Sequence, residues 1–174
     1  MHKLAPLLFT AALAACGQPP PPGPALRAQA RPLTCEAQQA RLLTASQGLL
    51  YLSETDAPLT VVVFPSQTLP TPAEIAATAG LGPDAEVQTV DFEAWFRPLV
   101  RAPEPGVYDP AVEAQARLTA RRYRELRQVF RKTYRERRVY RVRDAVNDPA
   151  VWRVFVLGTG ACGVSGLETV AIET

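Results

Sequence analysis

Histidine, the side chain most often used for acid–base and nucleophilic chemistry, occurs only once in this sequence. That residue is His2, which lies in an N-terminal segment expected to be removed by processing. Without an imidazole, Ser-His-Asp sites, Cys-His sites and histidine metal sites are excluded. The single lysine beyond residue 15 is Lys132, which lies inside a run of charged residues. We therefore expect a protein that is not an enzyme and that has no cofactor or metal of its own.

The first of the three cysteines has a context that indicates processing. Cys16 ends the run Leu13-Ala14-Ala15-Cys16-Gly17, behind one positive residue and an apolar stretch of about a dozen residues, too short to cross a bilayer. Leu-Ala-Ala-Cys resembles the lipobox of bacterial lipoproteins, although an ordinary signal peptide with an incidental cysteine is the alternative. We expect residues 1–15 to be a signal peptide and Cys16 to carry a lipid anchor in the cell envelope. Gly17, rather than aspartate, favours the outer membrane in a host with two membranes.

The other two cysteines, Cys35 and Cys162, could form a disulfide. An exported protein is in an oxidising environment that permits disulfides, and the even count is consistent with one. Two buried free thiols are the alternative, because the sequence does not give the distance between them.

Two further segments carry oxygen-rich side chains. Ser53-Glu54-Thr55-Asp56 places two carboxylates two residues apart beside hydroxyl groups, and by itself it predicts a turn with local hydrogen bonds. The sequence ends with a predicted strand followed by Glu173 and Thr174. Considered alone, such a chain end would simply fray.

Charge is strongly segregated along the chain. Residues 117–143 contain twelve of the nineteen Lys and Arg residues but only two acids, whereas residues 54–113 contain ten acids and two arginines. Guanidinium groups bind phosphates well, but these arginines alternate with apolar residues on one predicted helix. That pattern is typical of a solvated helix face or of a face that docks on an anionic surface. We expect no direct binding of nucleic acid.

The pattern of apolar residues predicts an α+β domain behind a spacer. Residues 16–32 contain the anchor cysteine and a proline-rich tether, which favours an extended conformation, and residues 33–174 form the predicted domain. Helical spacing and capping residues predict helices at 33–47, 72–80, 91–98 and 112–137. β-Branched and aromatic runs predict strands at 59–64, 86–90, 139–142, 151–157 and 167–172. The last two strands are joined by a predicted glycine-rich turn at 158–163, and short connections predict a mostly antiparallel sheet with helices packed on it.

Four sequence blocks, taken together, resemble the nuclease A inhibitor-like family. They are residues 48–58, 139–142, 154–158 and 166–174, and their order and approximate spacing agree across residues 33–174. The resemblance implies an α-β-α sandwich. It also implies a protein partner, a magnesium-dependent DNA/RNA endonuclease that does not discriminate between sugars.

The resemblance also implies which residues contact the nuclease. In the Ser53-Glu54 pair, Glu54 would engage an arginine of the enzyme. At the C-terminus, Glu173 and Thr174 would lie at the same interface, and Thr174 would reach the catalytic metal of the enzyme. We therefore expect a lipid-anchored nuclease inhibitor. The alternative is an envelope lipoprotein that does not inhibit and that docks through its basic helix.

Overall fold

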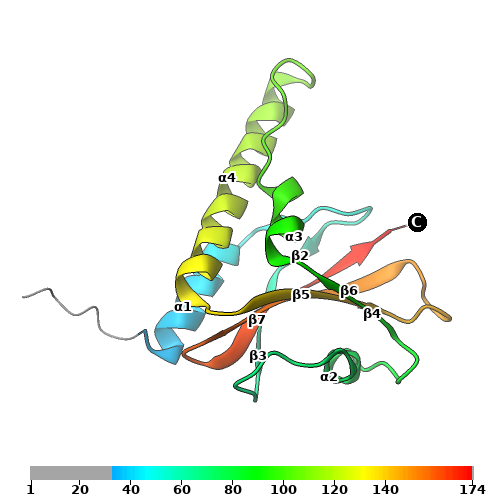
Figure 1. Cartoon of the computed structure of the whole chain (residues 1–174). Helices are drawn as coiled ribbons and strands as arrows, with labels where there is room; N and C mark the ends of the chain where they lie inside the picture. Colours follow the sequence, from blue (N-terminus) through cyan, green and yellow to red (C-terminus); the bar gives the residue numbers. More distant parts are fainter. Residues whose placement is uncertain (1–32, 174) are drawn as a thin grey trace, which may run out of the picture. The chain divides into compact units, whose positions relative to one another are not determined.

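Helices cover both faces of a five-stranded antiparallel sheet in the computed structural model, which describes residues 33–173 (Figure 1). The strand order is β3-β7-β6-β5-β4, and every pairing in this sheet is antiparallel. The strands are β3 (Thr60–Phe64), β4 (Glu86–Val90), β5 (Arg137–Arg143), β6 (Val151–Gly160) and β7 (Gly163–Ile172). The predicted α+β sandwich with an antiparallel sheet is confirmed. The predictions for the signal peptide, Cys16, the tether and Thr174 lie outside the described residues.

Three of the helices begin directly after the capping residues that the sequence predicts, whereas the longest begins at Pro110 behind Asp109, two residues before its predicted start. Thr34, Thr71 and Asp91 each accept a hydrogen bond from a backbone amide of the first helical turn that follows, which satisfies an otherwise unpaired donor. The helices are α1 (Cys35–Ser46), α2 (Pro72–Thr78), α3 (Phe92–Leu99) and α4 (Pro110–Thr133). Over residues 33–173, no helix combines the length and the apolar character needed to span a membrane.

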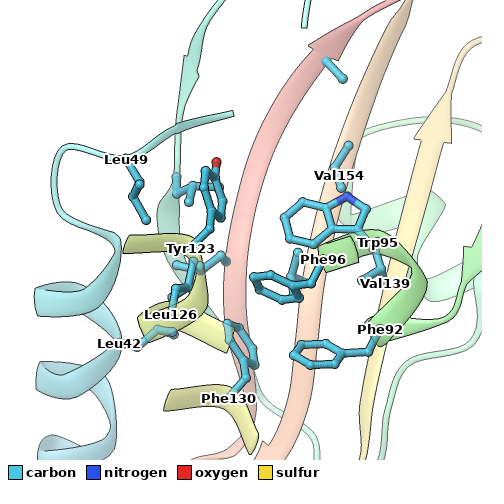
Figure 2. Close-up of a cluster of buried hydrophobic side chains, with 14 of the residues drawn as sticks. Leu42, Leu49, Phe92, Trp95, Phe96, Tyr123, Leu126, Phe130, Val139 and Val154 are labelled. Atoms are coloured by element: carbon cyan, nitrogen blue, oxygen red, sulfur yellow. The ribbon is translucent and has the colours of Figure 1, made fainter. Parts of the chain in front are cut away.

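Each face of the sheet has its own apolar core. Figure 2 shows the larger one, in which α1, α3 and α4 pack on the sheet through fully buried side chains such as Leu42, Phe96 and Phe130. On the opposite face, α2 contributes Ile75, which packs with Tyr140 of β5. Successive side chains of a strand point to opposite faces of the sheet, so β5 places Val139 in one core and Tyr140 in the other.

The long helix ends four residues before its predicted end, because its apolar pattern continues past the last helical residue. The predicted helix ran from residue 112 to residue 137, but α4 ends at Thr133 and Tyr134 has an extended backbone. The Tyr134 ring stacks on Phe130, and its hydroxyl lies 3.1 Å from the Ser165 hydroxyl of β7. Tyr134 therefore packs beside Phe130 although it lies beyond the last helical residue. For this reason the apolar pattern alone could not locate the end of the helix.

The glycine-rich segment 158–163 was wrongly predicted to be entirely a turn. The strands instead continue to Gly160 and from Gly163, which pair with each other, so the turn is confined to Ala161 and Cys162. A Cβ on Gly158 would lie 2.7 Å from the Tyr134 side chain, and one on Gly160 would overlap Gln38 of α1. These glycines therefore permit close packing inside a strand.

Candidate functional site

The Ser53-Glu54-Thr55-Asp56 segment lies at the tip of a small hairpin outside the main sheet. The hairpin strands are β1 (Leu50–Tyr51) and β2 (Ala57–Pro58), which pair only with each other. The Ser53 hydroxyl donates a hydrogen bond to the Thr55 carbonyl oxygen over 2.7 Å. This local bond is the kind of turn contact that the sequence predicts for a serine in this position.

Two hydrogen bonds join this hairpin tip to the end of β7. The Ile172 amide donates to the Ser53 Oγ over 3.1 Å, and the Glu54 amide donates to the Ile172 carbonyl oxygen over 3.2 Å. Residues 119 positions apart in sequence are therefore adjacent in space. We call the surface formed by Ser53, Glu54, Ile172 and Glu173 the C-terminal edge. Thr174 follows directly in the sequence but is outside the described residues.

The last described residue is held by its backbone and by its side chain. The Glu173 amide donates to the Ala150 carbonyl oxygen over 3.0 Å. Its carboxylate forms an ion pair with Arg141 of β5, at 2.5 Å between Oε2 and Nη2. Arg141 is 19% exposed, and its guanidinium lies 4.3 Å from the ring centroid of Trp152. Glu173, predicted to face a nuclease, thus has its carboxylate bound within the chain, while 47% of its side chain remains exposed.

Helices α3 and α4 support the hairpin from the core side. The buried hydroxyl of Tyr123 donates to the Leu50 carbonyl oxygen over 2.8 Å. The Tyr51 ring stacks on Trp95 at a centroid distance of 5.5 Å. Burial raises the pKa of Tyr51; Arg141 opposes this shift, and Glu173 adds to it. The hairpin is therefore attached to the core helices through its first strand, β1.

Several arginines of α4 have a partner in the structure, and most of these partners lie outside the helix. Arg127 and Arg131 both pair with Glu93 of α3, and the shorter of these contacts is 2.6 Å. Arg122 donates to the carbonyl oxygens of Gln47 and Gly48 just after α1. These residues join neighbouring elements, so the predicted solvated helix face is partly a structural one.

Four other cations gather around a groove of about 380 Å³ between α1 and α4. They are Arg41, Arg121, Arg124 and Lys132. None of them forms an ion pair with another residue in the part of the chain that the structure describes. Glu125 is the one acid that lines this groove, and no aromatic residue lines it. We call this surface the basic groove.

A disulfide between Cys35 and Cys162 attaches the start of α1 to the β6–β7 turn, with the two Cα atoms 4.6 Å apart. The buried Gln38 lies beside it. Its amide nitrogen donates to the Ser165 hydroxyl over 2.8 Å, and its amide oxygen accepts from the Ala161 backbone over 2.6 Å. Covalent and hydrogen bonds therefore place α1 on the same hairpin whose second strand ends at the C-terminal edge.

The sequence did not single out Arg141, Trp152, Tyr51 and Trp95, which surround the C-terminal edge. The one available signal was the alternation of Arg141 and Arg143 with apolar residues in and directly after the predicted strand 139–142, which places both arginines on one face. Within residues 33–173, no cluster of three or more acidic, cysteine or histidine side chains could hold a metal ion.

One comparison with known proteins covers both segments that form the C-terminal edge. A family model described as nuclease A inhibitor-like protein matches residues 36–174, and so includes the hairpin tip and the end of β7. No curated protein matches the chain.

Proposed function

Because the chain belongs to the nuclease A inhibitor-like family, we propose that it inhibits a magnesium-dependent, sugar-non-specific DNA/RNA endonuclease. One observation carries this proposal: the Ser53–Glu54 turn and the end of β7 are hydrogen-bonded to each other. These are the two segments that the family resemblance assigns to the nuclease interface. Their contact forms one surface that a single enzyme could cover.

The chemistry of this edge suits a metal-dependent nuclease. The Glu54 carboxylate would pair with an arginine of the enzyme, and such a charge-assisted bond is strong where water is excluded. An oxygen atom of Thr174 would occupy the position that the scissile phosphate takes at the metal, because Mg²⁺ prefers hard oxygen ligands. In this mechanism the inhibitor itself needs no metal or cofactor.

Nuclease activity measured against inhibitor concentration tests the proposal, with a purified bacterial endonuclease of this class and Mg²⁺. Removing one partner of a desolvated charge pair costs about 2–5 kcal/mol, so Glu54→Gln should weaken inhibition at least tenfold. Asp56→Asn, in the same turn, is the matched control and should change little. A tag appended after Thr174 should weaken inhibition as strongly, because it blocks the approach to the metal. Full inhibition by both Glu54→Gln and the tagged chain would rule out this mechanism.

We also propose that the protein acts in the cell envelope, anchored through a lipid on Cys16, with the outer membrane favoured in a host with two membranes. Support comes from the sequence Leu13-Ala14-Ala15-Cys16 and from the proline-rich segment after it. Cells supplied with a clickable fatty acid should label the wild-type protein but not Cys16→Ser. Labelled, membrane-bound Cys16→Ser protein would contradict the anchor.

The basic groove favours a second candidate function, which is docking on an anionic lipid surface. Its cations have no ion pairs with other described residues, and each cation near an anionic bilayer contributes about 1 kcal/mol. The double variant Arg121→Gln, Arg124→Gln should therefore bind phosphatidylglycerol vesicles roughly thirtyfold more weakly. Binding to these vesicles should also fall steeply with salt. Equal binding by wild type and double variant would reject this function.

A further inference from the structure

We propose that Arg141 is a positioning residue of the C-terminal edge, which holds Glu173 in place and thereby orders in advance the surface that the nuclease would cover. This inference rests on the proposed inhibition and names a residue that the inhibition would depend on. Arg141 would act through Glu173, with no contact of its own to the enzyme.

The strand order explains how Arg141 reaches Glu173. Arg141 lies in β5, Trp152 in β6, and Glu173 directly follows β7, so the three residues belong to consecutive strands of the sheet. The guanidinium lies over the indole ring, 4.3 Å from its centroid, and its Nη2 meets the Glu173 carboxylate. Stacking on an aromatic ring and an ion pair together fix the planar guanidinium in one orientation.

The ion pair completes a set of contacts around the chain end. Ile172 is bonded through its amide and its carbonyl oxygen to the hairpin tip, and the Glu173 amide is bonded to Ala150. With its carboxylate on Arg141 as well, Glu173 is fixed at both its backbone and its side chain. A chain end that is ordered in advance loses less entropy when it binds.

Arg143 offers a matched control in the same strand. Its guanidinium also lies 4.3 Å from the Trp152 centroid, on the same face of β5. Its ion pair, however, is with Glu86 of β4, at 2.7 Å, and it also donates to the Pro149 carbonyl oxygen. Arg143 therefore shares the charge, the strand and the aromatic contact of Arg141, but not the contact with Glu173.

Inhibition of the endonuclease by full-length variants tests this role. Arg141→Gln and Glu173→Gln should each weaken inhibition about fivefold, which corresponds to ordering one side chain on binding. Arg143→Gln should stay within twofold of wild type. The double variant Arg141→Gln, Glu173→Gln should be no weaker than either single variant, because both remove the same contact. Arg141→Lys, which keeps the charge, should recover part of the loss.

A second measurement reports the chain end without the nuclease. A carboxypeptidase should release the C-terminal residues faster from Arg141→Gln and Glu173→Gln than from wild type, and at the wild-type rate from Arg143→Gln. Only variants that circular dichroism shows to be folded at the assay temperature are compared, so a purely structural loss would not produce this pattern.

The outcomes separate this inference from the proposed function. If wild type does not inhibit the endonuclease, the proposed function fails. If wild type inhibits and Arg141→Gln inhibits equally, the positioning role of Arg141 is overturned while the proposed function stands. Additive losses in the double variant would also overturn it, because Glu173 would then contact the enzyme independently of Arg141. Equal carboxypeptidase rates in wild type and Arg141→Gln would overturn it as well.

Discussion

The disulfide between Cys35 and Cys162 closes almost the whole domain, so its removal should strongly destabilise the protein. The two cysteines are 127 residues apart, and closing a loop of that length lowers the entropy of the unfolded chain by an amount worth about 5 kcal/mol. Native domains have a total stability of only about 5–15 kcal/mol. The Gln38 hydrogen bonds to Ser165 and Ala161 would remain after the disulfide is removed. The expected loss therefore arises mainly in the unfolded state.

This energy predicts a large shift in melting temperature. A unit the size of Pro32–Thr174 has an unfolding entropy of roughly 0.3 kcal/mol/K. The double variant Cys35→Ser, Cys162→Ser should therefore melt about 17 °C below the oxidised parent. Both proteins should carry Cys16→Ser, so that no third thiol can exchange with the pair.

Thermal unfolding followed by circular dichroism, with and without reductant, is the measurement. Reductant should lower the melting temperature of the parent to nearly that of the double variant, and should not affect the double variant. A difference below about 3 °C between the oxidised parent and the double variant would refute the entropic argument. Two freely alkylated thiols in the folded, unreduced parent would refute the disulfide itself.

Two further predictions concern the packing of the sheet and the start of α4. The free energy of unfolding, measured with urea, should fall by about 3 kcal/mol in Gly166→Ala, because the added Cβ would overlap the Val156 carbonyl oxygen. It should not change in Gly82→Ala, because nothing lies within 4 Å of the added Cβ. Equal stability of the two variants would contradict this prediction. Hydrogen bonds from the Tyr108 amide and from two neighbouring amides, together with Arg117, lower the pKa of Glu113. The ionised Glu113 carboxylate therefore stabilises the fold above the unfolded-state pKa of about 4.3. This stabilisation is lost as the pH falls through the lower pKa of the folded state. Glu113→Gln should thus be less stable than wild type at pH 7 and nearly equal to it at pH 2; the same difference at both pH values would show that the carboxylate charge is not responsible.

Local signals in the sequence determine most of the regular elements. Thr71, Pro72 and Glu74 lie within four positions of one another, and they start α2 with the capping box that their types predict. The strand at residues 86–90 has its predicted bounds, and the helix after Asp91 begins where its cap predicts. In each case the residues that determine the boundary are close together in sequence, so no tertiary contact is needed to find it.

Tertiary contacts decide the elements that were missed or misplaced. The strands β1 and β2 are two residues long and pair with each other, too short to leave an alternating pattern. The end of α4 depends on Tyr134 meeting Ser165, which is 31 residues away. The glycines of the β6–β7 hairpin were misread because their role is to admit Gln38 and Tyr134, which lie far away in sequence.

The candidate site shows the same division between local and distant determinants. The types of Glu54 and Glu173 can be read from the sequence, and the resemblance to a family placed them at one interface. Their actual proximity comes from backbone bonds to Ile172, and the pairing of Glu173 with Arg141 comes from the order of β7, β6 and β5. Strand order depends on contacts between residues far apart in the chain, and periodicity reports only which face of its own element a residue occupies. The sequence by itself thus determined the side chains available at this edge, whereas the tertiary structure decided which of them meet.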